Sequence, residues 1–237
     1  MTIKKTIMPV FVLALAASLA QPLTVAAQTQ SVAERVVALK ASLAASQIIL
    51  KQYEWIETTA VSLKGDEKSR KVNQCYYGAD GGVTKVPLST PPPPQKKRGL
   101  RGKIIASKTE ELTDYMQQAV ALVKSYVPPN PALIQSAKDA GKVSLDIIQP
   151  GKRVRLNFRD YLKPGDMLSL EVDMANNRLL GLKVKTYIEK PKDAVSLDAR
   201  MASLNDGTTY PDAITLNATK KKVTVVVDNA GYRKAAH

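Results

Sequence analysis

The sequence predicts an α+β protein built on one antiparallel β-sheet whose apolar face is covered by helices. The first observation is residues 153–189, where apolar and polar side chains alternate with a period of two through three successive runs. The second is that Lys-Pro-Gly-Asp at 163–166 and Ala-Asn-Asn at 175–177 separate these runs with residues typical of turns. The third is that helical patterns at 31–51 and 110–126 carry apolar stripes that need a partner. We therefore expect an antiparallel meander with one apolar face, covered by protein or by a ligand.

The N-terminus has the features of a secretory signal peptide. Two lysines precede an apolar stretch at 7–19, and Val-Ala-Ala at 25–27 has the small side chains of a cleavage site. The apolar stretch is short and contains Pro9, which argues against a membrane-spanning helix. We therefore expect export out of the cytoplasm, cleavage near Ala27 and a single domain over 28–237.

The chain is strongly basic, with a net charge of +14. An exported protein does not normally meet nucleic acid, so we expect no nucleic-acid partner, whereas anionic lipid head groups are available outside the cytoplasm. A solvated, solubilising surface explains the charge equally well. Cys75 is the only cysteine, so no internal disulfide can form, and we expect a buried free thiol.

The N-terminal half is predicted to be a helix followed by strands. Ser31 and Glu34 match a capping box at the start of the helix over 31–51. Apolar residues then recur along one helical face, namely Val32, Val36, Leu39, Leu43 and Leu50. Three runs rich in β-branched and aromatic residues follow as antiparallel strands, at 53–63, 70–77 and 83–88.

Residues 89–102 (STPPPPQKKRGLRG) are predicted to form an exposed, Pro-rich basic loop. The default interpretation is a mobile spacer, and a docking arm is the alternative. After it, Ile104 and Ile105 suit a short edge strand. Thr109 is placed to cap the helix over 110–126, because Glu110 and Glu111 follow in its first turn.

A third helix and the remaining strands complete the prediction. Asn130-Pro131 starts the helix and Gly141 ends it. Strands are expected at 143–149, 195–201, 213–217 and 220–228, in addition to the meander. Asn-Asp-Gly at 205–207 is a hairpin turn signal, and Pro211 suits an edge or strand-start position. The run of valines in the last strand predicts burial on both faces.

The reactive side chains argue against an enzyme. The single histidine, His237, is the C-terminal residue, where chains are usually poorly ordered. One cysteine and no paired histidines exclude the common zinc patterns. The sequence also lacks a nucleophile elbow, a phosphate-binding loop and a dinucleotide fingerprint. We therefore expect no catalysis, no metal and no cofactor.

Four short segments near the C-terminus resemble a known family. They are Leu204-Asn205-Asp206-Gly207, Tyr210-Pro211-Asp212-Ala213-Ile214, Val223-Thr224-Val225-Val226-Val227 and Asn229-Ala230-Gly231-Tyr232. With the order of elements, they resemble the periplasmic lipoprotein-carrier (LolA-like) superfamily. The resemblance implies a curved, unclosed antiparallel sheet, or half-barrel, with helices capping a concave face that accepts acyl chains.

Two features depart from that family: the basic charge and the Pro-rich loop. The family's ligand-gating arginine also matches no single position. Arg153, Arg155 and Arg159 lie on the face opposite Val154 and Phe158, so we expect them to form a solvent-facing ladder.

The resemblance and the apolar sheet face predict a non-catalytic carrier for a lipid, an acyl chain or a lipidated protein, with a membrane or lipoprotein as a further partner. Candidate ligand-binding residues come from the strands and from the helical lid: Trp55, Leu112, Met116, Val123, Val154, Leu156, Phe158, Leu170, Val172, Leu182 and Val184. The same side chains suit an ordinary filled core, so both interpretations stay open. A second hypothesis is an envelope scaffold or sensor that binds a protein partner. In either case we expect a monomer.

Overall fold

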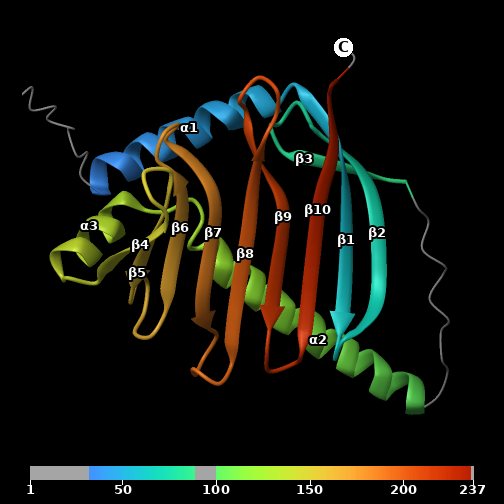
Figure 1. Ribbon diagram of the computed structural model, residues 1–237. Coiled ribbons are helices and arrows are strands. Elements are labelled where there is room, and N and C mark those ends of the chain that lie inside the picture. The colour runs from blue at the N-terminus through green and yellow to red at the C-terminus, as the bar shows by residue number, and fades with distance from the viewer. Residues whose placement is uncertain (1–31, 89–99, 236–237) are drawn as a thin grey trace, which may run out of the picture. The chain divides into compact units, whose positions relative to one another are not determined.

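The computed structural model describes residues 32–88 and 100–235 (Figure 1). The predicted signal peptide, Ser31 and the Pro-rich segment up to residue 99 lie outside these residues. The helices are α1 (Val32–Leu50), α2 (Leu100–Lys124) and α3 (Pro131–Asp139). The strands are β1 (Tyr53–Leu63), β2 (Asp66–Tyr77), β3 (Val83–Pro87), β4 (Val143–Gln149), β5 (Arg153–Arg159), β6 (Met167–Asp173), β7 (Arg178–Tyr187), β8 (Ala194–Ser203), β9 (Thr209–Ala218) and β10 (Val223–Lys234).

All the strands belong to one antiparallel sheet in the order β3-β2-β1-β10-β9-β8-β7-β6-β5-β4. β3 and β4 are its two edges, so the sheet is not closed. β1 pairs with β10, which joins the first three strands to the end of the chain. The long strands are visibly bowed in Figure 1. The predicted α+β fold with a curved, unclosed antiparallel sheet is confirmed.

The helices pack on one face of this sheet, as predicted. Leu39 of α1 and Ile134 of α3 are buried in one cluster with Phe158 of β5. Ala119 of α2 is buried in a second cluster with Leu216 of β9. Figure 1 shows α2 running diagonally behind the strands. The predicted meander is also present, because β5, β6 and β7 pair in succession as antiparallel neighbours.

α2 begins earlier than predicted. Ile104 and Ile105 lie inside α2, so the predicted edge strand is wrong. Thr109 is an internal residue of the helix, and its carbonyl oxygen accepts a hydrogen bond of 2.9 Å from the Thr113 hydroxyl. Leucine, arginine, lysine and alanine in the segment before Thr109 favour helix, and no proline interrupts it. The helix therefore extends back into the last residues of the predicted loop.

α3 has the predicted termini. The Asn130 side chain accepts a hydrogen bond of 2.9 Å from the backbone N–H of Ala132, and Pro131 is the first helical residue. Gly141 adopts a φ of +67° just beyond the helix, a conformation that glycine adopts without steric cost.

The last two strands differ from the prediction. β9 starts at Thr209 rather than 213, and Pro211 lies within it, opposite Met201 at a register shift. The pairing of β9 with β10 reaches only to Ala213, so Pro211 lies beyond it. The predicted burial of β10 on both faces is wrong: Val223 is buried, but the valines at 225–227 are half-buried. The reason is that the helices cover only one face, and only part of it.

A buried carboxylate fixes the loop between β5 and β6. Asp166 is 2% exposed and accepts hydrogen bonds from the backbone N–H groups of Tyr161 (2.5 Å), Leu162 and Lys163 (both 3.0 Å). It also accepts a bond of 2.6 Å from the Tyr126 hydroxyl, just beyond α2. Burial raises the pKa of Tyr126 above its ordinary value, so the phenol stays protonated and donates. Asp166 therefore joins the end of α2 to the sheet.

Replacing this carboxylate should destabilise the fold. In Asp166→Asn one oxygen becomes an NH2 group, which cannot accept the bonds from Tyr126 and the backbone. We expect the free energy of unfolding to fall by about 2 kcal/mol, measured by urea denaturation. Asp139→Asn, at the exposed end of α3, is the matched control and should leave stability nearly unchanged. Equal effects of the two changes would contradict the assigned role.

Candidate ligand-binding cleft

Cross-strand pairing aligns apolar side chains in rows across the concave face, the face that carries the helices. One row contains Phe158, Leu168, Val184, Leu197, Leu216, Val225 and Val61. The next contains Leu156, Leu170, Leu182, Ala199, Ile214, Val227 and Thr59. The first row is apolar from β5 to β1, and the second is apolar from β5 to β10 and ends at the polar Thr59 of β1. This face therefore forms a nearly continuous apolar floor.

Burial changes along these rows. Phe158, Leu168 and Val184, at the β5–β7 end, are 0% exposed. At the other end, Ile214 of β9 and Val227 of β10 are only half-buried. The concave face is therefore filled over β5 to β7 and accessible over β9 and β10, and the edge strand β4 beyond β5 is exposed as well.

α2 forms one wall of a cleft at the accessible end. One stripe of the helix is buried against β8 and β9, namely Tyr115, Ala119 and Val123. A neighbouring stripe, Leu112, Met116 and Val120, is only half-buried. These three side chains and Val61 of β1 line a cleft of 560 Å³, completed by Thr113, Gln117, Ala121 and Lys124. This volume lies within the range of about 300–1,000 Å³ typical of small-molecule sites.

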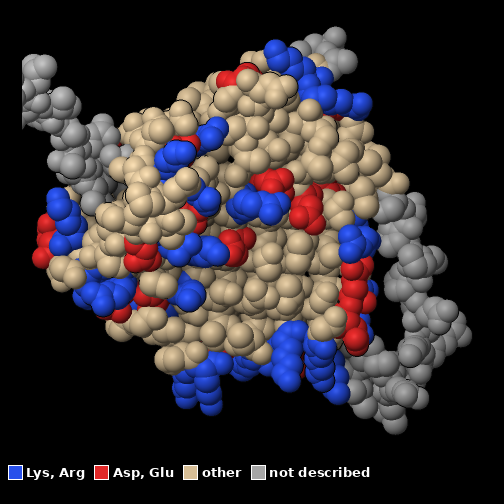
Figure 2. Space-filling model, in the orientation of Figure 1, with Lys and Arg blue, Asp and Glu red and all other residues tan. Residues whose placement is uncertain are grey.

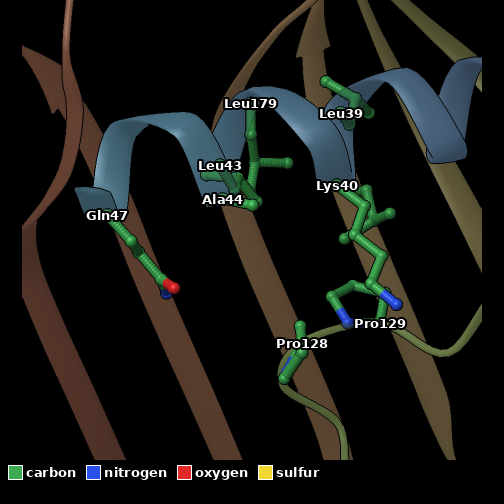
Figure 3. A pocket seen from close by; sticks show the side chains of 9 residues that line it. Leu39, Lys40, Leu43, Ala44, Gln47, Pro128, Pro129 and Leu179 are labelled. Carbon is green, nitrogen blue, oxygen red and sulfur yellow. The ribbon is translucent and has the colours of Figure 1, made fainter. Parts of the chain in front are cut away.

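A smaller gap lies under α1. It measures 170 Å³ and is lined by Leu39, Lys40, Leu43, Ala44, Gln47, Pro128, Pro129, Leu170 and Leu179. Figure 3 shows α1 above the loop that holds Pro128 and Pro129, with the Lys40 side chain extending towards that loop. This volume is below the usual range of about 300–1,000 Å³ for ligand sites. The gap therefore marks loose packing of α1 and offers less room than the cleft beside α2.

The structure divides the predicted ligand-binding residues into groups. The strand residues in the filled core are Val154, Leu156, Phe158, Leu170, Val172, Leu182 and Val184. Val123 is buried in the second cluster. Leu112 and Met116 line the cleft. A ligand contact by any of these residues remains a prediction, and the geometry favours Leu112 and Met116.

Trp55 belongs to an aromatic cluster nearer the start of β1. Its ring stacks on Tyr232 with centroids 5.5 Å apart, and Tyr77 lies at the same distance. Its indole N–H donates a hydrogen bond of 3.1 Å to the side-chain oxygen of Asn229. Tyr210 extends the cluster, 4.2 Å from Tyr232. Trp55 is therefore held by side chains of β2 and β10, and Val61 is the residue of β1 that borders the cleft.

An ion pair between a buried carboxylate and an exposed lysine borders the apolar floor on the β2 side. Glu57 is 8% exposed, and both its carboxylate oxygens lie 2.6 Å from Nζ of Lys85. The Thr59 hydroxyl donates a third bond, of 3.2 Å, to the same carboxylate.

Cys75, the partner of Trp55 across β1 and β2, is a buried free thiol, as predicted. Burial raises its pKa, which keeps the thiol protonated and unreactive.

The opposite, convex face carries the arginine ladder that the sequence predicts. Arg153 and Arg155 both form ion pairs with Glu171 of the neighbouring strand, the second at 3.1 Å. Figure 2 shows this face with acidic and basic side chains close together. Because these arginines are paired and point away from the cleft, they do not gate it.

Within the described residues, no group of three or more His, Cys, Asp or Glu side chains is placed to hold a metal ion. Across the same part of the chain, none of the helices has the length and hydrophobicity needed to cross a bilayer.

Comparison with known proteins gives similarity in fold only. No family model matches the sequence, and no curated protein matches it significantly. A LolA superfamily protein from Nitrosomonas europaea is 10% identical with a TM-score of 0.37, over 84% of this chain and 94% of that one. A DUF1329 family protein from Desulfovibrio piger is also 10% identical, with a TM-score of 0.31 and the same coverage. A chain of the Pseudomonas aeruginosa MucA/MucB complex is 10% identical, with a TM-score of 0.22 over 86% of this chain and 100% of that one.

The two ends of the apolar floor should respond differently to a polar substitution of equal size. Val184→Thr buries a hydroxyl in the filled core and should cost about 1–3 kcal/mol of unfolding free energy. Val227→Thr places the same hydroxyl at the accessible end, where water can reach it, and should cost less than about 1 kcal/mol. Urea denaturation of both variants measures the difference. Equal losses would mean that both ends are equally closed.

Proposed function

We propose that the protein is an exported, non-catalytic periplasmic carrier that binds the acyl chain of a lipid or lipidated protein in the cleft between α2 and β1. The observation that carries this proposal is the cleft in which Leu112, Met116 and Val120 of α2 lie opposite Val61 of β1, the strand that pairs with the half-buried valines of β10. A soluble protein gains stability by covering such a surface, and an acyl chain is an apolar ligand of suitable shape.

The energetics favour an acyl chain as the ligand. Each buried methylene contributes about 0.8 kcal/mol, so about ten of them contribute roughly 8 kcal/mol before the cost of association is subtracted. The apolar floor is continuous across several strands, which suits a long unbranched chain better than a compact polar metabolite. Lys124 at one end of the cleft is a charged residue able to meet a polar head group.

The anchoring of α2 bears on how a ligand enters. The Tyr115 hydroxyl donates a hydrogen bond of 2.7 Å to Asp193, and Tyr126 is bound to Asp166 beyond the helix. These two contacts hold the buried side of α2 against the sheet, while the cleft is already open beside Leu112 and Val61. Uptake of a chain therefore needs rearrangement of a few side chains and no displacement of the whole helix.

Filling the cleft should block acyl binding. Met116→Trp places an indole in the volume that the chain needs, so we expect affinity for a fluorescent fatty-acid analogue to fall at least about tenfold. Gln118→Trp, on the exposed side of the same helix, is the matched control and should bind normally. A fluorescence titration of both variants measures the effect. Equal binding by the two variants would place the ligand elsewhere.

The mass of the natural complex provides a second check. We expect a native mass spectrum of protein purified from cell envelopes to show a bound lipid, and added lipid to raise its melting temperature. If both measurements find no lipid, the carrier function is wrong, and a scaffold or sensor that binds a protein partner becomes the better proposal.

One observation favours that alternative: edge strand β4 exposes Leu145, Ile147 and Ile148, so a partner strand could pair there.

A further inference from the structure

Three hairpin turns lie side by side at one end of the sheet. The backbone N–H of Lys64, in the β1–β2 turn, donates a hydrogen bond of 2.8 Å to the carbonyl of Lys222, in the β9–β10 turn. The N–H of Thr219, in the same β9–β10 turn, donates one of 3.0 Å to the carbonyl of Ala194, which follows the β7–β8 turn. These bonds join the turns into one continuous edge, so their side chains project from a single surface.

This edge is rich in lysine, and we call it the lysine rim. It consists of Lys64, Lys190, Lys192, Lys220, Lys221 and Lys222. Figure 2 shows basic side chains projecting along this end of the molecule, below the ends of β7 to β10 in the view of Figure 1. The six lysines of the rim are exposed, except Lys221, which is half-buried.

Most of this charge is not neutralised. Lys220 lies 3.3 Å from Asp193, and Lys221 is paired with Glu111 of α2. Among the described residues, the other four lysines of the rim form no salt bridge. Glu189, which precedes Lys190, is exposed and forms no salt bridge either. The rim therefore presents an excess of positive charge to solvent.

The lysine rim lies next to the mouth of the cleft. Val61, which lines the cleft, is separated from Lys64 only by the last two residues of β1. On the other wall, Glu111 is paired with the rim and immediately precedes Leu112, which lines the cleft. An apolar cleft that opens beside a row of lysines matches a lipid surface, whose anionic head groups overlie acyl chains.

We propose that the lysine rim docks this protein on an anionic lipid bilayer, with the mouth of the cleft towards the membrane. Lysine carries a compact charge on a flexible stem, which suits an array of mobile head groups. Each lysine held near an anionic membrane raises partition about fivefold. The docking itself depends only on the charge of the rim. If the protein is the proposed carrier, docking brings the cleft close to its lipid ligand.

Vesicle co-sedimentation tests the docking. The wild-type protein should bind phosphatidylcholine vesicles that contain phosphatidylglycerol at least about tenfold more strongly than pure phosphatidylcholine vesicles, and less strongly at high salt. The rim variant is Lys64→Gln, Lys190→Gln, Lys192→Gln and Lys222→Gln, and should lose at least about tenfold in binding. The control variant removes equal charge elsewhere, by Lys51→Gln, Lys138→Gln, Lys152→Gln and Lys234→Gln, and should lose much less. Urea denaturation confirms that both variants are folded.

The outcomes separate docking from ligand uptake. If the rim variant binds anionic vesicles as the wild type does, or if both variants lose binding equally, the proposed docking surface is wrong. Binding of wild-type protein to soluble polyglutamate as strong as to anionic vesicles would also overturn it, in favour of an acidic protein partner. Fatty-acid uptake from solution should be the same in the rim variant and the wild type, so a failure of docking leaves the carrier function standing.

Discussion

The helices of this protein are too small to cover the concave face of its sheet. Their 19, 25 and 9 residues give a combined length of about 80 Å, which at a width of about 10 Å covers about 800 Å². Ten strands at a spacing of about 4.8 Å and a mean length of about 30 Å form a face of about 1,440 Å². Within the described residues, about half of the face is therefore left without a helix.

The accessible part of the concave face lies mainly over β10 and β1, because the helices pack elsewhere on the sheet. α3 and the buried side of α1 pack over the meander from β5 to β7, and α2 packs over β8 and β9. On the β2 side of β1, the floor is bordered by the ion pair of Glu57 and Lys85 and by the aromatic cluster around Trp55. The accessible apolar surface is thus bordered by a filled core on one side and by polar and aromatic side chains on the other.

The sequence predicts the meander well and the helix α2 poorly, for physical reasons. Period-two alternation and two turn signals are local features, so the strands at 153–189 follow from residues close in sequence. Thr109 with Glu110 and Glu111 has the composition of a helix start, but the preceding residues are also good helix formers and carry the helix back to Leu100. Local sequence alone does not decide between these two starting points.

The cleft is only partly predictable. Leu112 and Met116 follow from helical periodicity, and Val120 continues the same spacing and could have been included. Val61, Ile214 and Val227 were missed because their partial burial depends on strand order. β1 lies beside β10 through pairs such as Val61 with Val225, which are far apart in the sequence. A reading of local patterns cannot tell which end of such a sheet lacks a helix.

The central claim is that an acyl chain occupies the accessible end of the concave face. The most direct test is methyl NMR of the protein, with labelled valine and leucine side chains, titrated with a fatty acid that carries a nitroxide spin label along its chain. We predict strong broadening of the methyl signals of Val61, Val225 and Val227, and much weaker broadening of those of Leu156, Leu168 and Val184. Broadening in the second set with none in the first, or no broadening at all, would contradict the account.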